Sequence, residues 1–446
     1  LFLLARVPAM KSLLNPGQSV GEYSGYATSI FLIGWATGGL LFGVLGDRIG
    51  RAKTMMLTIL VYSICTGLSA LSTGFWDFAF YRFVTGLGVG GEFAVGVALV
   101  AEVMPERARA SALGLLQALS AVGNVSAAGI SILFGDLETK GLFPEGTAWR
   151  WMFVVGALPA FLALVIRARL REPDRWVKMR EAGKSPGSAQ LGSYAELFGN
   201  PNWRMPASLA GACVAAIILI SFVAPKTLPK LQIGLVLSAV AIGFGVWAIR
   251  GSGQPSRWRK NAVVGLGLAC VGVLGLWGIA FFSFDLTRLV FLKAFQAQGL
   301  TDLEIAGKLT KWAGITSVMQ NVGGFLGIYS FAVVCQRIGR KPTFAIAFTA
   351  AMIATASVFW FLEPGPVSGR LTFWQEAAVF HQIFWLIPIM GFCQLALFGG
   401  YAIYFPELFP THLRSTGTSF CYNVGRFVAA SGPTILGLLT ARVFSE

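Results

Sequence analysis

Apolar runs recur along the whole chain, and no other feature of the sequence constrains its fold as strongly. Each run is long enough to cross the ~30 Å hydrocarbon core of a bilayer as a helix of about 20 residues. Hydrophobic residues make up 55% of the sequence, whereas soluble domains average roughly 45–50%. The sequence therefore predicts an all-α, multi-pass membrane protein. We expect spans at 1–10 (in part), 24–45, 54–72, 78–101, 110–133, 150–168, 206–224, 231–249, 261–284, 313–334, 343–362, 379–404 and 415–439.

The pattern of charge argues against a nucleic-acid partner and orients the chain in the membrane. The net charge is +15, but the lysines and arginines are spread over short loops between the apolar runs. Basic residues in such loops favour the cytoplasmic side. When the loop at 46–53 is placed in the cytoplasm, most of the basic residues fall on the inner side, so we expect this orientation.

Residue types that carry catalysis or bind metals do not form a recognisable pattern. The six cysteines fall within or at the edges of apolar runs, where they are typical small packing residues. His381 and His412 are too far apart in sequence to indicate a metal site. The glycine-rich "GLGVGG" has no phosphate-loop lysine. We therefore expect no enzyme activity, no cofactor and no metal.

Two short motifs occur twice, once on each side of a long polar stretch. "GDRIGR" (46–51) recurs as "CQRIGR" (335–340), and "EVMPERAR" (102–109) is matched by "ELFPTHLR" (407–414). Each pair falls on the same membrane face, which indicates parallel repeats. We therefore divide the chain into an N-terminal bundle (1–168), a cytoplasmic linker (169–205), an inserted transmembrane hairpin (206–250) and a C-terminal bundle (251–446).

Several motifs resemble those of the major facilitator superfamily. "GVLGDRIGRAK" (43–53) is similar to the signature loop between its second and third helices, and "RFVTGLGVGGEF" (82–93) to its fourth-helix motif. The two Glu–Arg loops and "EPDRW" (172–176) resemble the sugar-porter and organic-acid branches. "GGEF" and the set Gly425, Arg426, Gly432 and Pro433 are most similar to proton symporters for metabolites, aromatic acids and sialic acid.

The resemblance implies two helical bundles, related as parallel repeats, around a central cavity. Family members have twelve helices, and this sequence departs from that number. Two additional transmembrane helices (206–224 and 231–249) lie between the halves. The last helix and the first half of helix one are expected to be missing, together with an acid that family members often carry in helix one.

The resemblance also assigns a gating role to charged residues that clasp helix ends while the cytoplasmic side is closed. These residues are Asp47, Arg48, Arg51, Glu102, Arg109, Arg337, Arg340, Glu407 and Arg414. Gln336 replaces the acid in the second copy of the motif, so we expect the second clasp to be weaker. We expect the first clasp to consist of exposed pairs, each contributing only ~0–1 kcal/mol.

Two ionisable residues in span 78–101 are candidates for proton coupling. Glu92 lies near the middle of the span, where a carboxylate costs at least ~2.5 kcal/mol unless it is paired or faces water. It either binds protons or substrate, or is a protonated side chain bonded between helices. Arg82 is nearer the outer end, and in the sugar-porter branch the matching arginine pairs with the acid of helix one. The alternative is a structural tie.

Polar residues in several spans are candidates for substrate binding. Arg426 is the best candidate for an anion site, because a guanidinium binds a carboxylate through two parallel hydrogen bonds; the alternative is a salt bridge to another helix. Gln117, Ser120 and Asn124 recur at helical spacing and line either a cavity or a helix contact. The remaining candidates are Trp277, Gln320, Asn321, Gln394, Tyr401, Tyr422 and Asn423.

We interpret the chain as a secondary transporter of a small polar solute in a bacterial inner membrane. Its expected partners are the lipid bilayer, protons and a small-molecule substrate that carries a carboxylate. A sugar or polyol is the alternative substrate. A transporter-like subunit or sensor that docks a membrane-complex partner through residues 206–249 is the alternative of another class.

Overall fold

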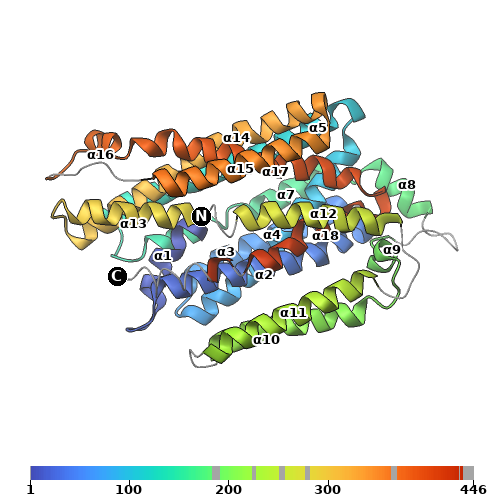
Figure 1. Ribbon diagram of the computed structural model, residues 1–446, viewed down its shortest axis with the longest axis horizontal. Helices are drawn as coiled ribbons and strands as arrows, with labels where there is room; N and C mark the ends of the chain where they lie inside the picture. The colour runs from blue at the N-terminus through green and yellow to red at the C-terminus, as the bar shows by residue number, and fades with distance from the viewer. Residues whose placement is uncertain are drawn as a thin grey trace.

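The fold is helical throughout the part of the chain that the structure describes. This computed structural model of the chain describes all residues except 1, 183–190, 224–227, 251–256, 277–281, 363–368, 431 and 435–446. Its main helices are α1 (Phe2–Leu13), α2 (Val20–Ile49), α3 (Arg51–Leu68), α4 (Phe75–Val103), α5 (Glu106–Thr139), α6 (Ala148–Val155), α7 (Ala160–Arg169), α8 (Asp174–Ala182), α9 (Tyr194–Phe198), α10 (Arg204–Val223), α11 (Leu228–Arg250), α12 (Arg257–Leu274), α13 (Phe282–Gln296), α14 (Asp302–Ile338), α15 (Arg340–Phe361), α16 (Phe373–Val379), α17 (Leu386–Glu407) and α18 (Arg414–Ala429). Figure 1 shows most of them running side by side along the longest axis of the molecule.

Seven helices of the described residues are long and apolar enough to cross a membrane: α2, α3, α4, α5, α14, α15 and the segment that ends with α17. Two predicted spans differ from the structure. The span expected at 150–168 is interrupted between α6 and α7, where Pro159 precedes the second helix. The span expected at 261–284 contains most of α12 and the first residues of α13. Helix α13 starts at Phe282 and continues beyond the predicted end of the span, to Gln296.

The same packing of helices occurs in each half of the chain. In the first half α2 lies against α4, and in the second α14 lies against α17. Glycine permits both contacts: a Cβ at Gly38 would overlap the carbonyl oxygen of Leu87, and a Cβ at Gly327 would overlap that of Phe392. Backbones can approach this closely only where the side chain is absent. The two helical bundles of the predicted fold are present.

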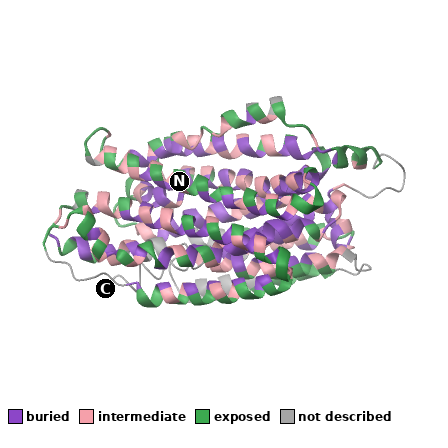
Figure 2. Cartoon of the chain, turned by 90° about the horizontal axis from the view of Figure 1, so that it is seen from above, coloured by how far each residue is buried: buried purple, intermediate pink, exposed green. Residues whose placement is uncertain are grey.

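Two helix pairs join the bundles to each other. α2 packs against α18, and α5 packs against α14 along much of its length. Asn124 of α5 donates to Asn321 of α14 at 2.9 Å, and Ser419 of α18 donates its hydroxyl to the carbonyl of Gly39 of α2. Figure 2 shows the buried residues concentrated toward the middle of the molecule, with exposed residues at the ends and on the outer faces.

The helices α10 and α11 form a hairpin at the edge of the molecule. In Figure 1 the pair lies below the other helices and approaches them at the end where α9 lies. The contact there includes a hydrogen bond from the Asn200 side chain to the carbonyl of Ala248, at 2.9 Å. Arg259, in the first turn of α12, donates to the carbonyl of Arg250 at 2.9 Å. These contacts attach the hairpin at the end where α11 finishes.

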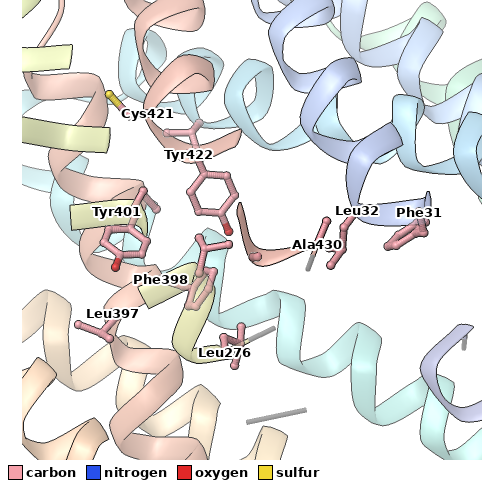
Figure 3. Packing of buried hydrophobic residues seen from close by; sticks show 14 of the residues in the cluster. Phe31, Leu32, Leu276, Leu397, Phe398, Tyr401, Cys421, Tyr422 and Ala430 are labelled. Atoms are coloured by element: carbon pink, nitrogen blue, oxygen red, sulfur yellow. The ribbon is translucent and has the colours of Figure 1, made fainter. Parts of the chain in front are cut away.

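Aromatic residues fill the core where α17 and α18 meet. The ring centre of Tyr422 lies 5.9 Å from that of Phe398 and 6.3 Å from that of Tyr401. Figure 3 shows the three side chains near one another. Burial of such side chains contributes roughly 1.5–3 kcal/mol each relative to exposure. This core positions the face of α18 that carries the candidate anion site.

Candidate functional site

Arg51 is the centre of a buried ion network at the end of the bundles that the charge pattern predicts to face the cytoplasm. Its guanidinium lies 2.9 Å from both Asp47 and Glu102. It also donates to the carbonyl oxygens of Gly46 at 2.7 Å and Thr411 at 2.9 Å. Asp47 and Arg51 are fully buried, so our expectation that this clasp is made of exposed pairs is wrong. The sequence motif does not reveal the cover that α18 provides.

Asp47 joins α2 to α18, although the two helices are distant in sequence. Its carboxylate accepts hydrogen bonds from the backbone N–H groups of Ser415 and Thr416, at 3.3 and 2.8 Å. The Thr416 hydroxyl donates to it as well, at 2.6 Å. A carboxylate at this position satisfies the free N–H groups of a helix start and interacts favourably with its dipole.

The second copy of the motif forms a more exposed ion pair. Arg340 donates to both carboxylate oxygens of Glu407, at 3.3 and 2.7 Å, and both side chains keep about a third of their exposure, at 31% and 33%. Gln336 donates to the Ser111 hydroxyl of α5 at 3.1 Å. Arg337 is exposed. In the second clasp the neutral amide of Gln336 joins the two bundles, whereas in the first clasp the carboxylate of Asp47 does so.

A segment of the linker crosses the cytoplasmic ends of α2 and α18. Arg48 donates to the carbonyl of Leu191 at 3.2 Å, and the Tyr194 hydroxyl donates to that of Leu40 at 3.0 Å. On the other side, the Glu196 carboxylate lies 2.8 Å from His412, and Phe198 packs edge-on against Phe420. The linker therefore contacts both bundles.

Arg82 is buried near the outer end of α4. Its guanidinium donates to the hydroxyls of Ser69 and Thr85 and lies 4.6 Å from the ring centre of Phe153. No carboxylate of the described residues pairs with it. Glu92 is ten residues further along the helix, about 15 Å away along the axis. The structure therefore does not bring these two candidates together.

Glu92 is half-buried on the face of α4 that packs against α3. Gly88, one turn earlier, lies against the backbone of Tyr62 in α3, and Tyr62 is also the electrostatic neighbour of the Glu92 carboxylate. Within the described residues the carboxylate has no hydrogen-bond or ion-pair partner.

Arg426 is a buried guanidinium between two aromatic rings. The guanidinium carbon lies 4.3 Å from the ring centre of Trp35 and 4.0 Å from that of Tyr422. One amino group donates to the Tyr422 carbonyl at 2.7 Å and to Asn423 Oδ1 at 2.9 Å. The arginine is 1% exposed. Among the described residues no carboxylate neutralises it, and its buried Nε has no acceptor. This arrangement can bind an anion.

The amide candidates divide into partnered and unpartnered groups. Asn124 and Asn321 bond to each other, and Asn423 bonds within α18. Gln394 donates to the Thr355 hydroxyl, but its oxygen has no partner within the described part of the chain. Gln320 is 1% exposed, and neither atom of its amide is hydrogen-bonded to a described residue.

The other candidates contribute less to the site. Tyr401 is fully buried, and its hydroxyl donates to the carbonyl of Leu268 at 2.7 Å. Gln117 is half-buried on α5. Trp277 lies outside the described residues. No group of three or more potential metal ligands occurs among the residues that the structure describes.

Sequence reasoning did not identify three residues that shape these sites. Trp35 covers Arg426 from α2, and Phe93 of α4 stacks on Tyr422 with 3.9 Å between ring centres. Glu172 accepts hydrogen bonds from the backbone N–H groups of Arg51, Ala52 and Lys53, at 2.7, 3.2 and 3.2 Å. Two signals were available: Phe93 ends the quoted motif "RFVTGLGVGGEF", and Glu172 begins the quoted motif "EPDRW".

Comparisons with known proteins agree with the fold. A model of the Major Facilitator Superfamily matches residues 7–328. A metabolite transport protein of Haemophilus influenzae is 27% identical over 438 residues, covering 98% of this chain and 83% of that protein. A cis,cis-muconate transport protein of Acinetobacter baylyi is 24% identical, covering 94% and 78%. The fold is similar to a partially occluded, inward-open structure of the xylose transporter XylE from E. coli, with a TM-score of 0.55, 14% identity, and coverage of 100% and 97%.

Proposed function

This chain belongs to the major facilitator superfamily, and on that premise we propose that it moves a small organic carboxylate by alternating access, coupled to protons, across a bacterial inner membrane. Its family consists of transporters, so the chain is a multi-pass membrane transporter and not an enzyme. The substrate, the coupling ion and the membrane are the proposed parts.

Arg426 carries the proposal for the substrate. A buried guanidinium with no counter-carboxylate among the described residues is costly unless an anion reaches it. The rings of Trp35 and Tyr422 stabilise the cation through their π faces by about 2 kcal/mol when the site is desolvated. They leave Nε available for the hydrogen bond that a carboxylate accepts. A relative named for cis,cis-muconate transport is consistent with this substrate class.

Glu92 supports the proposal of proton coupling. It lies within a membrane span, is half-buried and has no ion-pair partner among the described residues. Intramembrane carboxylates of this kind mark proton or substrate pathways. Because Glu92 lies on the face of α4 that packs against α3, its protonation can change the packing of these two helices.

A sugar or polyol is the second candidate substrate. Gln320 favours it, because an amide that bonds to no described residue can donate to and accept from hydroxyl groups. The similar solved structure is named as a xylose transporter.

Uptake by vesicles containing the purified chain tests the proposal. Labelled cis,cis-muconate, nicotinate and xylose are offered with and without an inward proton gradient. We expect accumulation of a carboxylate only with the gradient, and at least tenfold weaker uptake by Arg426→Lys, because lysine lacks the planar fork. Arg107→Lys, on the exposed start of α5, is the control.

The uptake experiment gives a different result for a sugar porter and for a chain that transports neither class of substrate. Accumulation of xylose that is unchanged by Arg426→Lys would favour the sugar porter. Absence of uptake for all three probes, with no thermal stabilisation by a wider set of carboxylates and sugars, would contradict transport of either class.

A further inference from the structure

Two arginines from different helices lie against one carboxylate at the cytoplasmic end, and a third arginine lies near one of them. Glu102 of α4 lies 2.9 Å from Arg51 of α3 and 3.5 Å from Arg414 of α18. Arg109 of α5 is close enough to repel Arg414 electrostatically, as are Arg51 and the exposed Arg175 of α8. Positive charge therefore exceeds negative charge in this network.

Several of the N–H groups of these arginines are buried without an acceptor. They are Nε of Arg51, Nε and Nη2 of Arg109, and Nη1 of Arg414, none of which is hydrogen-bonded to a described residue. Arg414 Nη1 is within ion-pair distance of Glu102 but makes no hydrogen bond to it. Buried donors without acceptors are rare in folded proteins, and each needs an explanation.

The two carboxylates of the network cannot supply the missing acceptors. Asp47 is engaged by Arg51 and by the start of α18. Glu102 uses Oε1 for Arg51, while its buried Oε2 has no donor. The network therefore contains several buried donors without an acceptor and one buried acceptor without a donor.

We infer that a phosphoryl anion binds between Glu102, Arg51, Arg109 and Arg414 and holds the cytoplasmic end closed. Its oxygens accept from guanidinium groups that approach from three helices, as arginine forks favour. A hydroxyl of the same ligand, either the P–OH of hydrogen phosphate or a hydroxyl of a phosphatidylglycerol headgroup, donates to Glu102 Oε2. Arg414 belongs to one bundle and the other groups to the other, so the site is complete only while the bundles meet.

Ligand-dependent stability tests this inference without any transport assay. Melting of the purified chain is followed in detergent as inorganic phosphate is titrated at constant ionic strength with chloride. It is followed again in nanodiscs of phosphatidylcholine with or without phosphatidylglycerol. A ligand that binds only the closed state raises the melting temperature saturably and lowers the labelling of a cysteine introduced at Thr411 in a cysteine-free background.

Arg109→Gln is the decisive variant, because Nε and Nη2 of Arg109 donate to no described residue and their loss breaks no hydrogen bond within the described part of the chain. We expect its apparent affinity for the anion to fall at least tenfold, as for loss of a charge-assisted hydrogen bond. Arg107→Gln removes an exposed charge from the same turn of α5 and should retain the effect. Arg109→Lys keeps the charge but not the planar fork, so its apparent affinity for the anion should lie between those of the wild type and Arg109→Gln. It replaces Arg109→Gln in the test if that variant does not fold.

The detergent and nanodisc experiments distinguish the two sources of the phosphoryl group. Saturable stabilisation by phosphate in detergent indicates the free anion, and stabilisation only with phosphatidylglycerol indicates the lipid. The inference is overturned if neither ligand stabilises the chain, or if Arg107→Gln and Arg109→Gln reduce the effect equally.

Discussion

Asp47 of α2 and Thr416 of α18 are 369 positions apart in sequence, yet the carboxylate accepts two hydrogen bonds from this one residue. The backbone N–H donates at 2.8 Å and the hydroxyl at 2.6 Å. The same carboxylate lies 2.9 Å from Arg51. One buried side chain thus fixes the distance between the bundles at the cytoplasmic end.

Asp47→Asn should weaken this closure and also lower stability. The amide loses a charge-assisted interaction with both Arg51 and the start of α18, and we expect a cost of about 1–3 kcal/mol. Melting temperature and labelling of the cysteine at position 411 measure the two effects. Asp136→Asn is the matched control, because its pair with Lys140 is also separated by four residues but is 55% and 63% exposed. Equal effects of both substitutions would contradict a special role for Asp47.

Tyr422→Leu should weaken carboxylate binding, because it removes the aromatic ring that lies beside the guanidinium of Arg426. The ring face 4.0 Å from the guanidinium is lost, together with about 0.5–2 kcal/mol of cation–π interaction. Tyr422→Phe keeps that face and should bind nearly as well as the wild type. Thermal stabilisation by the transported carboxylate measures both. Identical losses in the two variants would show that the hydroxyl, and not the ring, matters.

Glu92→Gln should abolish proton-driven accumulation while leaving substrate exchange partly intact. Coupling requires a group whose protonation changes, whereas binding at Arg426 does not. Accumulation under a proton gradient and counterflow without one are measured on the same vesicles. Glu106→Gln, at the exposed start of α5, should change neither rate. Equal accumulation by Glu92→Gln and wild type would remove Glu92 from the mechanism.

Gly38→Ala should lower expression and melting temperature sharply. The new methyl group would overlap the carbonyl of Leu87 in α4, and because both atoms belong to packed helices, relief requires moving a backbone. Gly123→Ala is the control, since no atom lies within 4 Å of a Cβ placed there. If both alanine variants melted like the wild type, α2 and α4 would not be packed as described.

Glu172→Gln should destabilise the cytoplasmic start of α3 by about 1 kcal/mol, as the loss of other helix caps does. The carboxylate now accepts from three consecutive N–H groups, and an amide oxygen carries no charge to attract the helix dipole. Hydrogen exchange at Arg51–Lys53 reports the loss. Glu181→Gln, at an exposed position of α8, should leave exchange there unchanged.

The apolar runs and repeated motifs were sufficient to predict the helical bundles, because bilayer thickness fixes helix length and the family motifs fix the order of helices. They could not predict the break between α6 and α7 or the continuation of α13 to Gln296. Those features depend on which side chains neighbouring helices cover, and hydropathy of one segment contains no such information.

The sequence allowed prediction of some residues of the candidate site but not of the residues that cover them. Arg426 could be singled out because a charged residue in an apolar run is rare. The rings of Trp35 and Phe93 could not be singled out as site residues, because aromatic residues in a span usually pack against lipid or against the protein core. The burial of Asp47 depends on α18, far along the chain, and charge patterning of a loop does not show which distant helix covers it.

The glycine contacts that join α2 to α4 and α14 to α17 also limit which motions the molecule can make. Backbones in direct contact cannot slide without large steric penalties, so we expect each bundle to move as a rigid body. In the proposed alternating access, the bundles would then move relative to each other at the contacts between α2 and α18 and between α5 and α14. Spectroscopic labels within one bundle should keep their separation through the whole cycle. Only label pairs that span both bundles should report the turnover of the transporter.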